Sequence, residues 1–332
     1  MIKVGIPRAL LYYQYYPMWR TFFEELGAEA IVSPVTSRVM LQEGGARVVA
    51  DTCLPVKIFI GHVLSLIGNC DFIFIPTIRS IRKNTYNCSK FLGLSAMTRA
   101  AVPEAPPILD IMVDVNKGRL RLYQAIYRLG KNFTPYPHKI RQASLDAWRT
   151  QLKYRYMMSN RGLTQPQAIA KVLGTSTPES QVESPETKTT IAVIGHPYLL
   201  HDDFISHRII PRLKQANVKV LTPEMLADTT LESAVMKVMG RIQWTCESEI
   251  VGAGEHYLRS DVDGVINVMA FGCGPDSLMM DVIRRQATRL RSTPFMNLTI
   301  DEHTSEVGII TRLEAFMDMI YRKQRARVAV CG

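Results

Sequence analysis

Short apolar runs alternate with segments of helical spacing along residues 1–117. Apolar residues recur at helical spacing in residues 17–26 and 53–66, and Gly27 follows the first of these segments as a stop signal. Runs of strand length occur at residues 2–6, 30–32, 72–75 and 107–115. Continuous apolar runs of this kind are typical of strands buried in parallel sheets. The pattern predicts βαβ units around a parallel sheet.

The pattern changes twice further along the chain. Residues 118–173 show helical spacing throughout and no strong strand signal, which indicates a helical insert. Residues 174–189 are polar, contain proline and have almost no large apolar side chain, which is typical of a linker or loop. Strand signals return at residue 190. We therefore predict a first α/β domain at residues 1–117, the insert, the linker, and a second α/β domain at residues 190–332.

The second α/β segment repeats the start of the first. Gly5-Ile6-Pro7 corresponds to Gly195-His196-Pro197, and each is followed by a helix and then by a strand that ends in proline. The strand-like residues 71–76 correspond in the same way to residues 263–268. Such self-similarity indicates two related halves. The predicted fold is α/β, with two related Rossmann-like or flavodoxin-like parallel-sheet domains and a helical insert.

The chain has six cysteines, and no two of them have the Cys-x-x-Cys spacing. This excludes zinc-ribbon, thioredoxin-like and compact ferredoxin motifs. A disulfide framework is disfavoured in a chain of this length. Cys70, Cys246 and Cys331 occur at a strand start, on a helix and at the chain end, and we interpret them as structural.

The other three cysteines lie in turn-like contexts that begin helix-like segments. A helix N-terminus favours a low-pKa thiolate or an anionic group. Cys88 and Cys273 also follow corresponding strands of the two halves, and ligands gather beyond the carboxyl ends of parallel strands. We predict that the fold brings Cys53, Cys88 and Cys273 together as metal ligands. Zinc held by three cysteines with a histidine or water is an alternative.

A polar segment, Asp301-Glu302-His303-Thr304-Ser305-Glu306, follows the strand-like residues 295–300. Glu302 and His303 are thereby expected at a strand end near Cys273, and both side chains can donate or accept protons. We predict these two residues as catalytic. The alternative is structural, because Thr304 and Ser305 can cap the helix that follows.

The 332-residue chain has a formal net charge of +10, which favours an anionic partner: nucleic acid, a phosphorylated small molecule or an acidic protein. A solvated cationic face is the simpler interpretation. No helix-turn-helix or aromatic-interleaved basic motif supports nucleic acid, and no G-x-G-x-x-G or Walker motif indicates a nucleotide site. No apolar stretch approaches the roughly 18 residues of a membrane span. The first residues lack the features of a signal peptide, so we expect a cytoplasmic protein with no membrane partner.

Several segments, taken as a set, resemble one protein family. They are Gly5-Ile6-Pro7-Arg8-Ala9-Leu10, Cys53-Leu54-Pro55-Val56-Lys57, Cys88-Ser89-Lys90-Phe91-Leu92-Gly93-Leu94, Phe271-Gly272-Cys273-Gly274-Pro275, and Asp301-Glu302-His303-Thr304 with Thr311-Arg312-Leu313-Glu314-Ala315-Phe316. This set resembles the acyl-CoA dehydratase activase-related proteins, which are relatives of the 2-hydroxyacyl-CoA dehydratase subunits and of the double-cubane cluster proteins. The resemblance covers roughly residues 1–110 and 190–325.

The resemblance implies an anaerobic iron–sulfur protein, with a 4Fe-4S cluster held by Cys53, Cys88 and Cys273 between the domains and one iron position open. It also implies electron transfer from an ATP-dependent activase or another low-potential electron donor; in the dehydratases, the electron passes to the substrate thioester and expels its 2-hydroxyl group. This chain would receive the electron, because it lacks the nucleotide-binding motifs of the activase. A CoA thioester or other small-molecule ligand and a homodimer are further expectations.

Two functions compete with that of a reductase or dehydratase. One is a non-enzymatic iron–sulfur cluster carrier or electron-transfer module, which would lack the closed pocket that an enzyme needs beside the cluster. The other is a cluster-free regulatory or binding protein with structural thiols, which would be colourless.

Overall fold

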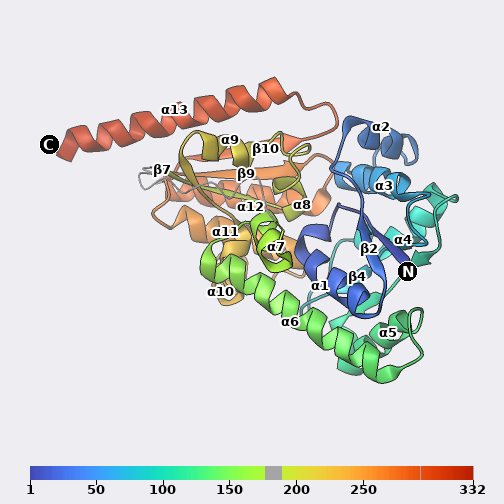
Figure 1. Ribbon diagram of the computed structural model, residues 1–332. Coiled ribbons are helices and arrows are strands. Elements are labelled where there is room, and N and C mark those ends of the chain that lie inside the picture. The colour runs from blue at the N-terminus through green and yellow to red at the C-terminus, as the bar shows by residue number, and fades with distance from the viewer. Residues whose placement is uncertain (176–188, 292, 332) are drawn as a thin grey trace.

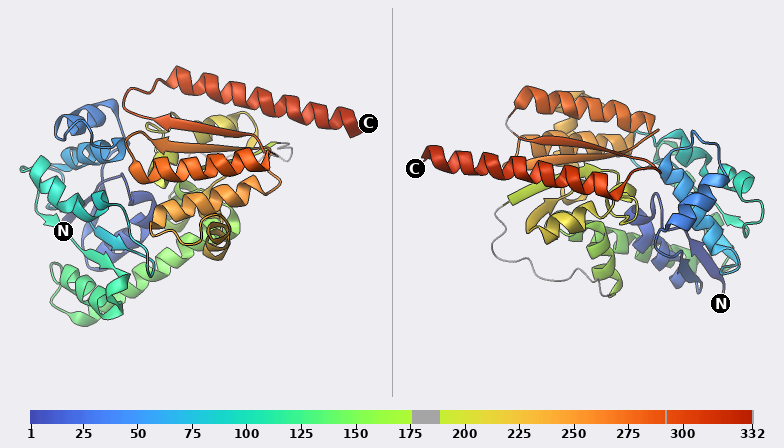
Figure 2. Two further views of the ribbon diagram at one scale, coloured as in Figure 1. Left: turned by 180° about the vertical axis from the view of Figure 1, so that it is seen from behind. Right: turned by 90° about the horizontal axis from the view of Figure 1, so that it is seen from above.

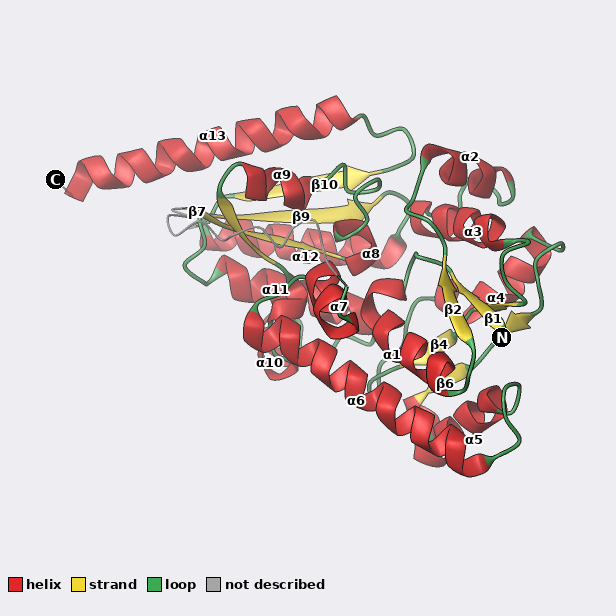
Figure 3. Ribbon diagram, in the orientation of Figure 1, coloured by secondary structure: helices red, strands yellow, loops and turns green. Residues whose placement is uncertain are grey.

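The strand-like runs of the sequence form two four-stranded parallel sheets, one in each half of the chain (Figures 1 and 3). The structure is a computed structural model that describes residues 1–175, 189–291 and 293–331. The first sheet has the order β2-β1-β3-β5 and the second the order β10-β9-β7-β8, while β4 and β6 form a small third sheet. The strands are β1 (Lys3–Ile6), β2 (Glu29–Val32), β3 (Phe72–Phe74), β4 (Thr77–Ser80), β5 (Ile108–Leu109), β6 (Met112–Asp114), β7 (Thr189–Gly195), β8 (Val218–Leu221), β9 (Gly264–Ala270) and β10 (Phe295–Ile300).

Helices cover both faces of the second sheet, with α9 and α13 on one face and α11 and α12 on the other (Figure 2). Helices on both faces bury a parallel sheet completely, and every residue of β9 is buried. The predicted α/β class with two Rossmann-like or flavodoxin-like sheets is therefore confirmed. The helices are α1 (Tyr12–Glu25), α2 (Arg38–Ala46), α3 (Leu54–Leu66), α4 (Ser89–Ala101), η1 (Val115–Lys117), α5 (Arg119–Gly130), α6 (Pro137–Arg161), α7 (Gln165–Leu173), α8 (Pro197–Leu200), α9 (Ile209–Gln215), η2 (Pro223–Met225), α10 (Asp228–Val238), α11 (Thr245–Leu258), α12 (Gly274–Leu290) and α13 (Glu306–Cys331).

The two sheets share one topology and one local hydrogen bond. In the first sheet, β1 lies between β2 and β3, and β5 lies beyond β3. In the second sheet, β7 lies between β8 and β9, and β10 lies beyond β9. The backbone N–H of Lys3 donates to Asp71 Oδ2 at 2.8 Å, and the N–H of Thr190 donates to Asp263 Oδ2 at the same distance. Each aspartate precedes the third strand of its half and fixes that strand against the first. The repeat that the sequence indicated is thus present in three dimensions.

A close helix crossing occurs at the same place in both halves. A Cβ on Gly61 of α3 would lie 2.0 Å from the carbonyl oxygen of Met40 in α2. A Cβ on Gly252 of α11 would lie 2.6 Å from the carbonyl oxygen of Leu231 in α10. Only glycine permits backbones to approach this closely. The crossing holds the start of α3, which carries Cys53, in a fixed position.

The helices of residues 118–173 pack against both halves. Tyr154 of α6 is fully buried and donates its hydroxyl to the carbonyl oxygen of Tyr13 in α1 at 2.5 Å. Further along α6, Arg155 forms an ion pair with Asp228, the first residue of α10. The domain boundaries stay a prediction, and the expected linker at residues 174–189 falls mostly outside the described residues.

Two expected elements differ from the structure. The helix expected at residues 17–26 begins at Tyr12 and accommodates Pro17. The strand expected at residues 107–115 is split into β5 and β6. Asp110, at the break, instead accepts hydrogen bonds from the backbone N–H and the hydroxyl of Thr77, both at 3.2 Å. β5 consequently pairs with β3, and β6 pairs with β4. Among the described residues, none of the helices combines the length and the apolar character of a membrane span.

Candidate metal centre

Each of the three predicted cysteine ligands is the N-cap residue of a helix. Cys53 precedes α3, Cys88 precedes α4 and Cys273 precedes α12, and all three have extended backbone conformations and partly buried side chains. The helices that begin there come from both halves of the chain. Each thiol therefore lies at the positive end of a helix dipole, where negative charge is stabilised.

The three thiols interact electrostatically. Burial is the main cause that raises the pKa of Cys53 and of Cys88, and negative charge on Cys273 adds to it in both, so the three groups are within electrostatic range. Gly272, with a φ of +78°, also approaches the first half: a Cβ built on it would lie 3.9 Å from Cα of Cys53. A positive φ favours glycine, which explains the residue type in the turn that precedes Cys273. The roles of these cysteines as ligands stay a prediction.

The loop that leads to Cys88 is attached to the second half of the chain. The N–H of Tyr86 donates to the carbonyl oxygen of Gln243 at 2.6 Å, and the N–H of Thr245 donates to the carbonyl oxygen of Tyr86 at 3.0 Å. The side-chain amide of Asn87 donates to the carbonyl oxygen of Ile78 at 3.1 Å. These bonds position Cys88 although it follows an irregular segment.

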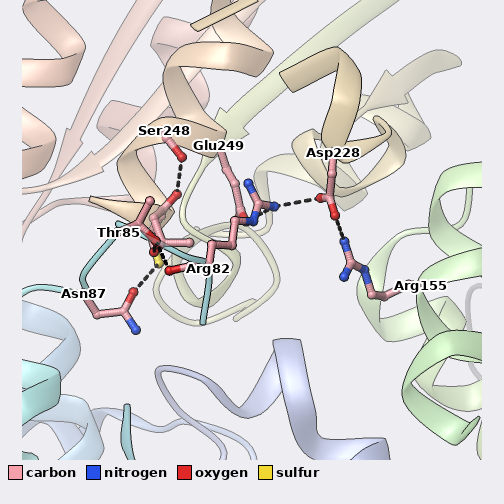
Figure 4. Close-up of polar contacts among 9 residues, drawn as sticks. Arg82, Thr85, Asn87, Arg155, Asp228, Ser248 and Glu249 are labelled. Carbon is pink, nitrogen blue, oxygen red and sulfur yellow. Dashed lines mark hydrogen bonds and ion pairs between the residues drawn. The ribbon is translucent and has the colours of Figure 1, made fainter. Parts of the chain in front are cut away.

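Ion pairs secure the same loop from further along it (Figure 4). Arg82 donates to Asp228 at 2.7 Å and to Glu249 at 3.0 Å, and Asp228 in turn contacts Arg155 of α6. A carboxylate shared by two guanidinium groups connects three parts of the chain: the Cys88 loop, α10 and α6. The approach of Cys88 to Cys273 is thus set by contacts that cross between the halves.

Burial raises the pKa of two of the thiols, whereas the sequence predicted a lowered pKa. It raises the pKa of Cys53 and of Cys88 above the ordinary value, and the backbone N–H groups of Val56 and Phe91 only partly oppose it. The sequence predicted that the helix N-termini would give low-pKa thiolates. In the structure desolvation outweighs the helix ends, so metal binding must displace protons from these two thiols.

A buried histidine and aspartate lie beside Cys273. One ligand atom each of His196, Cys273 and Asp276 lie within 4.8 Å of one another, an arrangement that could hold a metal ion. His196 is the N-cap of α8 at the end of β7, and Asp276 is in the first turn of α12. His196 Nε2 is 3.0 Å from Asp276 Oδ1, and the side chains are only 3% and 4% exposed. At that distance the carboxylate and the protonated imidazole form an ion pair.

Electrostatics and burial compete at this pair. Burial by itself lowers the pKa of His196, whereas the adjacent Asp276 carboxylate raises it, and the result lies well above the ordinary value. Nearby, burial raises the pKa of Glu247, opposed mainly by the positive charge of His196. Burial also raises the pKa of Cys246 to about 11. Cys246 Sγ lies 3.8 Å from Asn87 Oδ1, so this cysteine, interpreted as structural, borders the centre.

The two predicted catalytic residues lie differently from each other. Glu302 forms an ion pair with Lys57 at 2.6 Å, and this contact lowers the pKa of the Glu302 carboxyl. Lys57 is in the first turn of α3, so Glu302 reaches the helix that begins at Cys53. His303 is exposed, and its backbone N–H donates to Asp301 Oδ1 at 3.0 Å. Thr304 closes the same turn through two bonds of 2.8 Å with Asp301. Catalytic roles for Glu302 and His303 stay a prediction.

Sequence reasoning did not select His196 or Asp276. Their positions were visible in Gly195-His196-Pro197 and in Cys273-Gly274-Pro275-Asp276, but no ligand spacing connects the two segments. The available signal was that His196 directly follows a buried strand, β7, and that the neighbouring strand β9 leads to Cys273. Adjacent parallel strands place their carboxyl ends at one edge of the sheet.

Comparison with known proteins identifies a family but no individual relative. None of the curated proteins compared with the chain matches it. One family description, the CoA enzyme activase uncharacterised domain, matches residues 3–226. The match includes the first sheet, the helices of residues 118–173, Cys53, Cys88 and His196, and it ends before Cys273. Because it covers more than half of the sequence, the chain belongs to the family of the CoA enzyme activase uncharacterised domain.

Proposed function

We propose that this protein binds a 4Fe-4S cluster through Cys53, Cys88 and Cys273 and functions as an iron–sulfur redox protein. The observation that supports this most strongly is that three helices, from both halves of the chain, each begin at one of the predicted cysteines as N-cap residue. Thiolates are the protein ligands that iron–sulfur clusters require. A chance gathering of structural cysteines does not account for their shared N-cap position.

The donor set and its surroundings fit such a cluster. Helix N-termini direct backbone N–H groups and positive dipole ends toward bound anions, and an iron–sulfur cluster with its thiolates is anionic. Burial raises the pKa of Cys53, and the positive charge of Lys90, in the first turn of α4, opposes that rise. Three thiolates occupy three irons and leave one without a cysteine ligand.

When bound, the cluster supplies one-electron transfer at low potential. We propose that the electron comes from an ATP-dependent activase or another low-potential protein donor, in keeping with the family to which the chain belongs. Lys57 and Glu302 lie beside the first turn of α3 and hold the start of that helix. Their role is to fix the position of Cys53. A CoA thioester or small molecule as ligand of the open iron is part of the same proposal, and a cluster carrier is its non-enzymatic form.

A single divalent metal ion is a second candidate, and one observation supports it. The ligand atoms of His196, Cys273 and Asp276 lie within 4.8 Å of one another. Ligands of one tetrahedral zinc ion, with bonds of about 2.0–2.3 Å, lie roughly 3.5 Å apart. The spacing therefore suits zinc after small side-chain movements. Zinc at this group would not need Cys53 or Cys88.

The two candidates differ in the cysteines on which they depend. We expect Cys53→Ala, Cys88→Ala and Cys273→Ala, each purified anaerobically, to lose most of the iron, the acid-labile sulfide and the brown colour of the wild type. Cys70→Ala and Cys246→Ala are the controls and should keep full content. Iron and sulfide that persist in the first three variants would contradict the cluster. Zinc that is lost only in Cys273→Ala would instead support the single ion.

A further inference from the structure

His196 is a buried side chain whose polar atoms lack hydrogen-bond partners. The residue is 2% exposed, and neither Nδ1 nor Nε2 has a hydrogen-bond partner in the described part of the chain. A buried polar group without a partner loses its hydrogen bonds to water and gains none in the protein, so such groups are rare in native proteins and call for an explanation. Asp276 and Cys246 lie close to the ring, and a bound ion is one explanation for an imidazole that makes no well-directed hydrogen bond with them.

The other buried histidines of the described chain have hydrogen-bond partners, His62 at both ring nitrogens and His201 at one. His62 has Ser33 Oγ at 2.9 Å from Nδ1 and Thr36 Oγ1 at 2.9 Å from Nε2. His201 Nε2 is 2.6 Å from Glu224 Oε1. These contacts show that the fold ordinarily supplies partners to histidines that it buries. His196 differs from both in this respect, and it is the one that lies beside Cys273.

The position of His196 is fixed by the elements around it. It directly follows β7, which pairs with β9, and β9 leads into the turn of Cys273. Pro197 follows it as the first residue of α8, which restricts the backbone at this point. Tyr198 stacks on the imidazole, with ring centroids 4.9 Å apart and planes inclined by 16°. The ring therefore has little freedom to turn away from the centre.

Asp276 has the position that a carboxylate commonly takes beside a metal-binding histidine. Metal-ligating histidines commonly direct one ring nitrogen at a carboxylate while the other binds the metal. Asp276 Oδ1 is 3.0 Å from His196 Nε2, and a ring nitrogen of His196 lies within 4.8 Å of Cys273 Sγ. Imidazole is a suitable ligand for iron, and histidine replaces cysteine on one iron of some iron–sulfur centres.

We propose that His196 binds the iron that the three cysteines leave open, with Asp276 as the carboxylate that orients its ring. The inference rests on the proposed cluster and assigns its remaining protein ligand. It makes the centre a three-cysteine, one-histidine site. A substrate or exogenous ligand must then displace the imidazole before it reaches this iron.

The test uses the wild-type chain, so it does not depend on a variant that folds. The protein is produced with ¹⁵N-labelled histidine, loaded with its cluster anaerobically, reduced, and studied by pulsed electron paramagnetic resonance. A coordinated imidazole gives a nitrogen coupling several times larger than that of a backbone amide. We expect this large coupling to change from the ¹⁴N to the ¹⁵N pattern on labelling. A large coupling that labelling does not affect, or none at all, overturns the proposal.

Variants assign the coupling to one residue. His196→Gln should keep the iron and sulfide content of the wild type, lose the large nitrogen coupling and have a lower reduction potential, because histidine ligation raises the potential relative to anionic ligands. His201→Gln is the control and should keep the coupling. A coupling that persists in His196→Gln overturns the assignment. A wild-type protein without iron and sulfide overturns the proposed cluster itself, whereas a loaded protein without the coupling overturns only the histidine ligand.

Discussion

At the residue scale, the contact between the halves contains a buried polar chain. His62 of α3 lies between Ser33 and Thr36, and Thr36 donates its hydroxyl to Asp202 of the second half. Asp202 also accepts the backbone N–H groups of Phe204 and Ile205 at 3.0 and 3.1 Å. Burial lowers the pKa of His62 to about 4 and raises the pKa of Asp202 to about 6.

Asp202 makes the stability of the protein depend on pH. Its carboxyl binds a proton more tightly in the folded chain than in the unfolded chain, where the pKa is about 3.9. The corresponding stability is fully present below about pH 4 and is lost as the pH rises to about 6. We expect Asp202→Asn to remove this loss. Relative to wild type, the free energy of unfolding of the variant should therefore rise by about 3 kcal/mol between pH 4 and 6, and stay constant above.

The measurement is urea unfolding of both proteins across this pH range. His62 has the opposite dependence, because its lowered pKa adds stability as the pH rises from about 4 to 6.5. That contribution is common to both proteins and cancels in the difference. Asp203→Asn, which changes the exposed neighbouring carboxyl, is the control. A difference between Asp202→Asn and wild type that does not vary with pH would contradict the assignment.

At the element scale, strands and helices followed from local periodicity, but their close contacts did not. The alternation of apolar runs and helical spacing predicted the two sheets, because burial on both faces of a parallel strand leaves a continuous apolar run. Gly61 and Gly252 carried no such signal, since a glycine inside a helical pattern is compatible with many roles. Their role depends on α2 and α10, which the periodicity of α3 and α11 does not reveal.

We predict that replacing glycine by alanine destabilises the protein at the two helix crossings and stabilises it at an open helix position. Gly61→Ala and Gly252→Ala place a methyl group against backbone carbonyl oxygens, so we expect each to destabilise the protein by at least about 1–3 kcal/mol. Gly93→Ala in α4 is the matched control. Its Cβ would approach only the end of Met97, at 3.9 Å, and alanine favours a helix by about 0.5–1 kcal/mol. Thermal unfolding measures all three, and equal effects would contradict the crossings.

At the scale of the whole molecule, the net charge is concentrated in one segment. Residues 118–161 contain ten lysines and arginines and a single acidic residue, Asp146, whereas the whole chain has a net charge of +10. The outer face of α6 in this segment also exposes large apolar side chains at helical spacing: Leu145 (43%), Trp148 (53%), Leu152 (50%) and Tyr156 (49%). Basic residues around an exposed tryptophan are typical of protein interfaces. The charge favours an acidic partner, and the proposed electron donor is therefore predicted to bind this face.

The α6 face predicts an electron-transfer rate that depends on salt. We expect reduction of the loaded protein by an acidic donor, with reduced ferredoxin as the probe, to slow as ionic strength rises. Arg149→Glu with Lys153→Glu should slow it by about tenfold or more at low salt. Arg284→Glu with Arg285→Glu on α12 makes the same change in net charge and is the control. Rates that respond equally to the two pairs would contradict a donor site on α6.

The sequence by itself determined the local structure and the repeat, since apolar periodicity, helix starts and self-similarity are properties of neighbouring residues. It also singled out Cys53, Cys88 and Cys273 by their turn-like contexts. Only the tertiary structure decided that each of these three cysteines is the N-cap of a helix, and that His196 lies against Asp276 beside Cys273. Such encounters are decided by sheet order, helix crossings and the contacts between the halves, in which residues far apart in the chain become neighbours.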